Sequence, residues 1–117
     1  MATTKDFDSY DMQVSGGTTG RVALILCYKG NSFVGRVDFQ ADGTALSSDF
    51  LWHLASPTIT SIVLQMPMSR FDVVVNTLRQ ERPLKLHIDV DYQGGATTAG
   101  HGYLGTGIHE PVGELMG

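Results

Sequence analysis

The sequence predicts a small α+β domain, built from a mostly antiparallel, curled sheet of five to six strands with one helix packed on it, at about residues 69–82. Segments 33–40 and 84–92 alternate apolar and polar residues, as half-buried strands do. Residues 69–82 instead repeat apolar residues at helical spacing. The 117 residues suffice for one hydrophobic core, and no repeat or linker divides them, so 1–117 is predicted to be a single domain.

The residue pattern in the first third of the chain predicts a tail followed by strands. Residues 1–9 are polar and are expected to form a loose N-terminal tail, with a short strand at 10–14 after it. The run 21–29 is apolar on both faces, which is typical of a central strand covered on both sides. Gly30 and Asn31 favour a hairpin turn, and 33–40 is the returning strand.

The secondary structure of the middle segment, residues 46–54, is ambiguous from its sequence. Its large apolar residues fall four apart, which favours a short helix, although whether the segment is helical is left open. The residues with this spacing are Leu46, Phe50 and Leu54. Pro57 interrupts the segment, and 59–66 has the composition of a strand.

The helix at 69–82 has start and stop signals of its own. Ser69 and Asp72 form a capping pattern, and Met68 can pack against Val73 one turn further on. Pro83 ends the helix because a residue before proline is pushed out of the helical region. The apolar stripe expected to face the sheet consists of Phe71, Val74, Val75 and Leu78.

Residues 84–92 and 101–109 are expected to pair as a hairpin around the glycine-rich segment 94–100. A register that turns Leu104 toward the core places a set of polar residues on the opposite, solvated face. The four of these that could bind a metal ion are His87, Asp89, His101 and His109.

Two histidines and a carboxylate could bind zinc or another divalent ion, and an open coordination position could activate water. The alternative is an ordinary solvated strand face, because a shift of one residue in the pairing would send the partners to opposite sides. A metal-binding protein or metal-dependent enzyme is therefore the second functional hypothesis.

Gly100, Gly102 and Gly105 match the spacing G-x-G-x-x-G of dinucleotide-binding turns. That motif requires a helix after the glycines, and the sequence that follows them does not predict one. We therefore expect no cofactor, and we expect these glycines to let a neighbouring layer approach closely. Binding of an anion or nucleotide by backbone N–H groups is a third and weaker hypothesis.

Composition limits the class of partner. The net charge of −4 argues against nucleic acid, and the chain has no apolar run of the roughly 20 residues that a membrane span needs. The single cysteine, Cys27, excludes an internal disulfide, and a soluble cytoplasmic protein is expected. Residues 110–117 either pack through Pro111 and Val112 or form a loose tail.

The leading hypothesis is a non-enzymatic interaction or regulatory domain that forms a homodimer or binds a protein or small ligand. The doubly apolar strand 21–29 needs cover on both sides, and large aromatic and sulfur side chains favoured at interfaces are present. A two-fold dimer is the commonest way for a soluble chain to supply such cover.

Overall fold

A computed structural model describes residues 2–17, 19–53, 60–81, 83–90 and 97–106. These residues form eight strands, one short 3₁₀ turn (Met68–Arg70) and one α-helix. Their bounds are β1 (Ala2–Phe7), β2 (Ser9–Val14), β3 (Arg21–Lys29), β4 (Ser32–Gln40), β5 (Asp49–His53), β6 (Thr60–Pro67), α1 (Phe71–Gln80), β7 (Leu84–Val90) and β8 (Thr97–Thr106).

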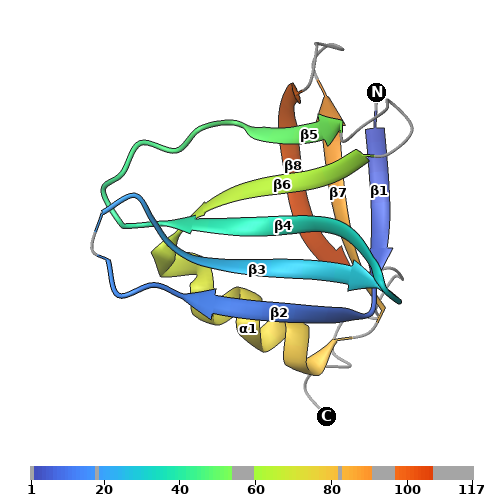
Figure 1. The fold of residues 1–117 in the computed structure, drawn as a ribbon, viewed down its shortest axis with the longest axis horizontal. Coiled ribbons are helices and arrows are strands. Elements are labelled where there is room, and N and C mark those ends of the chain that lie inside the picture. The colour runs from blue at the N-terminus through green and yellow to red at the C-terminus, as the bar shows by residue number, and fades with distance from the viewer. Residues whose placement is uncertain (1, 18, 54–59, 82, 91–96, 107–117) are drawn as a thin grey trace, which may run out of the picture.

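The eight strands form one sheet in the order β1-β7-β8-β5-β6-β4-β3-β2. The α+β class and the curl are confirmed, but the expected five to six strands are too few. β1 and β2 follow one another in the chain yet stand at opposite ends of this order, so the sheet curls until it nearly closes (Figure 1). All of these pairs are antiparallel except β4 with β6, and β5 lies between these two strands in the chain.

The expected loose tail at residues 1–9 is wrong, because residues 2–7 form β1 and pair with β7. Thr3, Lys5 and Phe7 alternate onto the inner face of the sheet, and Phe7 is buried. β1 thus supplies the second neighbour that β7 needs for its backbone hydrogen bonds. Residues 110–117 lie outside the described part of the chain.

The short helix favoured at 46–54 is also wrong, since residues 49–53 form β5 between β6 and β8. Leu51 is buried on the inner face, and Phe50 and Trp52 alternate onto the outer face. Backbone pairing with two neighbouring strands outweighs the four-residue spacing, which is a weak local signal.

Helix α1 begins and ends inside the predicted range of 69–82. Its apolar stripe is confirmed, since Val74, Val75 and Leu78 are buried. The predicted cap is wrong: Ser69 lies in the 3₁₀ turn, and its N–H donates to Asp42 Oδ1 at 3.0 Å. The predicted packing of Met68 on Val73 is wrong as well, because Val73 is 62% exposed while Met68 packs on the core.

The core fills the inside of the curl, with α1 packed against it behind the strands (Figure 1). Phe39 of β4 meets Phe71 of α1 edge to face, with ring centroids 5.0 Å apart. Gly35 allows close packing, because a Cβ there would collide with the Ile62 carbonyl and lie 2.6 Å from Leu86 Cδ1. The inner residues of the sheet therefore interlock at a separation that only glycine permits at position 35.

Strand β3 matches its predicted range, but it is not central and lies one place from the edge. Its inner residues Ile25 and Cys27 are fully buried, whereas Leu24 and Leu26 on the outer face are half-buried. The outer face of β3 is thus covered only in part by the described chain.

Candidate functional site

The β7–β8 hairpin forms in the predicted register. Leu86 pairs with Leu104, and Asp89 pairs with His101, so the apolar partners point into the core. Three of the four proposed metal ligands, His87, Asp89 and His101, consequently share the outer face of the sheet. His109, the fourth, lies outside the described residues.

His87 is the centre of this polar cluster. Its Nε2 lies 3.3 Å from Asp89 Oδ2, and its Nδ1 lies 2.7 Å from Thr4 Oγ1 of β1. The ring also stacks on Tyr103, with centroids 4.8 Å apart and planes 24° from parallel. A neutral imidazole protonated at Nε2 satisfies both bonds, donating to the carboxylate and accepting from the Thr4 hydroxyl.

Thr4 could not be found from the hairpin pattern, because it is 83 residues from His87 in the chain. The register of β1 on β7 places the two side by side. No alternation of apolar and polar residues marks β1 in the sequence, because the polar residues Thr3 and Lys5 share the inner face with Phe7.

The described ranges contain no group of three or more His, Cys, Asp or Glu side chains arranged to hold a metal ion. Both nitrogens of His87 have partners already, and Asp89 is 68% exposed at its side chain. His101 is exposed opposite Asp89. As it stands, the cluster is a hydrogen-bonded imidazole–carboxylate pair on the protein surface.

Gly100, Gly102 and Gly105 lie within β8 and do not form a phosphate-binding turn. A Cβ on Gly102 would collide with the His87 carbonyl oxygen and lie 2.6 Å from Leu64 Cδ2, and one on Gly100 would collide with the Asp89 carbonyl. The expectation of close approach is confirmed for Gly100 and Gly102, whereas a Cβ on Gly105 would meet only the ring of Tyr103 in the same strand. The N–H of Gly102 already donates a hydrogen bond to Asp49 Oδ2 at 2.9 Å, so it is not available to an anion.

A second polar cluster on the outer face surrounds Asp38 of β4, which is only 3% exposed. Its carboxylate accepts from Arg36 Nε at 3.0 Å, from Gln65 Nε2 at 3.0 Å and from Arg21 Nη1 at 3.5 Å. Arg36 also lies over the ring of Trp52, 5.8 Å from its centroid. The donors satisfy the buried acid, so this cluster ties β3, β4 and β6 together.

Cys27 is fully buried on the inner face. This burial raises the pKa of its thiol to about 12, because the thiolate would lose its hydration. The thiol is therefore protonated at neutral pH and belongs to the core.

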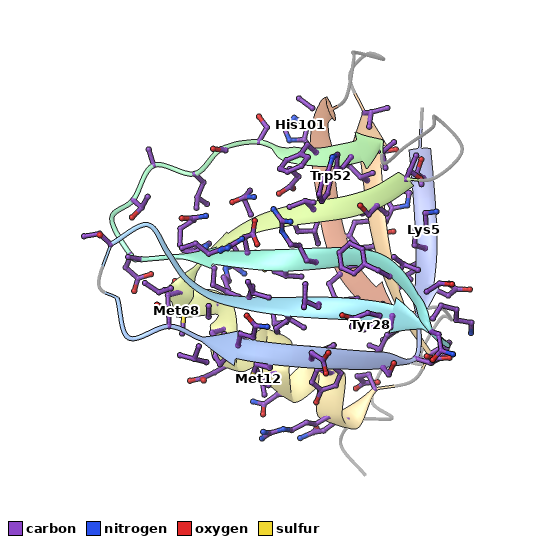
Figure 2. All side chains as sticks on the ribbon, viewed as in Figure 1. Lys5, Met12, Tyr28, Trp52, Met68 and His101 are labelled. Atoms are coloured by element: carbon purple, nitrogen blue, oxygen red, sulfur yellow. The ribbon has the colours of Figure 1, made fainter. Side chains whose placement is uncertain are left out.

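Strand β2 presents an open edge, since its pairing in the described chain is with β3 alone. Tyr10 and Met12 pack partly on the core, whereas Val14 is 64% exposed. A surface hollow of about 250 Å³ adjoins this end of the strand and is lined by residues 13–15 and 21–24. Figure 2 labels Met12 on β2 and Lys5 on β1, at the two ends of the sheet.

The described part of the chain contains no helix with the length and apolar character that a membrane crossing requires. A comparison with family models, with curated proteins and with solved structures found no match to this chain.

Proposed function

We propose that this chain is a non-enzymatic, self-associating interaction domain of the cytoplasm, and that association uses the open edge of β2. The observation that carries the proposal is the edge itself, where alternate backbone N–H and C=O groups of residues 9–14 have no strand beside them among the residues that the structure describes. Such an edge pairs readily with another strand, and main-chain hydrogen bonds then supply affinity. The buried, unpaired thiol of Cys27 suits a reducing compartment.

β2 has few of the residues that usually prevent an edge strand from pairing, which are prolines, lysines and other charged residues. Proline and lysine are absent from its sequence, SYDMQV, and its single charge is Asp11. Val14 adds an exposed apolar side chain beside the surface hollow. Contact with a partner strand would remove this apolar surface from water.

The test is the mass in solution, measured by sedimentation equilibrium over a range of concentrations. The proposal expects a dimer of the 12.7 kDa chain, weakened at least tenfold in the variant Val14→Pro. Proline removes an outward N–H without removing a bond to β3, and it blocks the approach of a neighbouring strand. Val14→Thr, which keeps the N–H, is the matched control and should dimerise like the wild type. A wild-type chain that stays monomeric at every concentration contradicts the proposal.

Metal binding by His87, Asp89, His101 and His109 is the second candidate function. Its support is the pairing of Asp89 with His101 next to His87, which gathers two imidazoles and a carboxylate on one face. A bound ion would replace the hydrogen bond between His87 and Asp89, and it would also draw on His109.

Calorimetric titration of the untagged protein with Zn²⁺ tests this candidate. The site predicts one ion per chain, with affinity at least tenfold lower in His101→Ala and unchanged in His53→Ala. Equal weakening by both substitutions, or no stoichiometric binding by the wild type, would exclude the site.

A further inference from the structure

We infer that the partner of β2 is β2 of a second copy of this chain, paired antiparallel about a two-fold axis with Met12 opposite its own counterpart. This inference rests on the proposed function and adds the identity of the partner and the register of the pairing. Three features of the described residues carry it: the protection of the other edge, the direction of the backbone groups of β2, and the side chains that each register brings together.

The other end of the sheet is not equally open. Lys5 of β1 lies opposite Leu86 on the inner face, and a charged residue that points inward on an edge strand discourages pairing with another chain. β1 also lies close to β3 and β4 because of the curl. β2 carries no inward charge, since Tyr10 and Met12 are its inner residues.

The hydrogen bonds of β2 to β3 fix which of its residues face outward. The N–H of Ser15 donates to the Val22 carbonyl at 2.7 Å, and Gln13 pairs with Leu24 two residues earlier. Backbone groups alternate in direction along a strand, so the odd-numbered residues point toward β3. The N–H and C=O groups of Tyr10, Met12 and Val14 consequently point toward the free edge.

Two copies of β2 can therefore pair only with outward residues opposite outward residues. A register centred on Asp11 sets the two Asp11 carboxylates opposite each other, with Cα atoms about 4.5 Å apart, where like charges repel. A register centred on Gln13 leaves the outward groups of Tyr10 without a partner. The register centred on Met12 avoids both faults.

With Met12 opposite Met12, all three outward residues of each strand have partners. Tyr10 lies opposite Val14 of the second copy and covers that exposed side chain. Asp11 lies opposite Gln13, whose amide can donate to the carboxylate, so the exposed charges meet a complementary group. The two sheets then continue into one another through a self-complementary edge.

Cysteine substitutions distinguish the registers. Asp11 and Gln13 are exposed, and residues opposite one another at non-hydrogen-bonded positions are about 4.5 Å apart at Cα, within the range of a disulfide. We expect that a mixture of Asp11→Cys and Gln13→Cys chains, once oxidised, gives a covalent heterodimer on a non-reducing gel, and that neither variant alone gives a covalent homodimer. Buried Cys27 serves as an internal control, because the wild type should not cross-link.

The outcomes separate the two proposals. A covalent homodimer of Asp11→Cys alone, or of Gln13→Cys alone, overturns the register centred on Met12. A wild-type dimer with no cross-link in the mixture also overturns it, and leaves self-association standing. A wild-type monomer in sedimentation removes both proposals. Cross-linking of the mixture that does not form when the oxidation is carried out in urea, where β2 is unfolded, supports the inference.

Discussion

Asp49 and Gly102 are 53 residues apart in the chain, and the Asp49 carboxylate accepts a hydrogen bond from the Gly102 N–H at 2.9 Å. Its second oxygen accepts from the Gln65 N–H at 2.7 Å. β5 begins at Asp49, while β6 and β8 continue past that point. The Asp49 carboxylate thus accepts hydrogen bonds from both β6 and β8, at the first residue of β5, beyond which the backbone of β5 no longer lies between them.

We expect Asp49→Ala to lower the free energy of unfolding by about 2–3 kcal/mol, since two N–H groups lose a charged acceptor. Urea unfolding followed by circular dichroism measures this. Asp42→Ala is the matched control, because Asp42 accepts one exposed bond, from the Ser69 N–H, and its loss should change stability by less than about 1 kcal/mol. Equal losses in the two variants would contradict the bridging role of Asp49.

Gly102→Ala should prevent folding or reduce stability by more than about 3 kcal/mol, because the new Cβ would collide with the His87 carbonyl and Leu64. Gly16→Ala is the control, with no atom within 4 Å of the added carbon. It should be neutral within about 0.5 kcal/mol. Soluble yield and thermal unfolding of both variants provide the comparison, and a well-folded Gly102→Ala protein would disprove the close approach of β8 and β7.

The buried thiol predicts a pH dependence at alkaline pH. Burial raises the pKa of Cys27 from 9.0 to about 12, so above pH 9.0 the unfolded chain loses a proton that the folded chain retains. The stability of the wild type relative to Cys27→Ala should be constant below pH 9.0. Above it, this difference should fall by up to about 1.4 kcal/mol per pH unit until the folded thiol titrates.

Urea unfolding of wild type and Cys27→Ala at several pH values measures that difference, and subtraction removes the titration of groups common to both. A thiol reagent at neutral pH should react with Cys27 only as fast as the chain unfolds. Rapid labelling of the native protein would show that the thiol is accessible.

Lys5→Val should change the assembly of the chain. Removing the inward charge favours packing of β1 on Leu86, and it also removes the protection of that edge. We expect species larger than a dimer in sedimentation velocity, with both edges then able to pair. Lys29→Val, which removes an exposed lysine from β3, is the control and should leave the mass unchanged. An unaltered mass for Lys5→Val would show that the curl alone closes the β1 edge.

Alternation of apolar and polar residues predicted the strands whose faces differ most. Alternation predicted β4 and β7, and Val37 and Ile88 on their predicted apolar faces are buried. The β7–β8 register followed from placing Leu104 inward. The predicted face of His87, Asp89 and His101 is correct for the same reason. Face assignment requires only a period of two, which the sequence displays directly.

The missed strands depend on distant partners. β1 has one deeply buried side chain, Phe7, and its pairing is decided by the free edge of β7. β5 was mistaken for a helix because Phe50 fits a helical spacing, and only its neighbours β6 and β8 decide otherwise. Thr4 was missed along with β1. The partners of β1 in β7 are 77 to 87 residues away and those of β5 in β8 are 45 to 51 residues away, and partners so distant leave no local pattern.

The corner at Asp8 joins the two ends of the sheet, and it is tied to the β3–β4 turn by bonds to Tyr28 and Gly30. β2 can pair with β3 as soon as the first third of the chain exists, but β1 must wait for β7. During synthesis β1 therefore leaves the ribosome before β7 does, and it is among the last of the described strands to find its place. Such non-local pairing slows folding, and truncation before residue 84 would leave β1 with no partner at all.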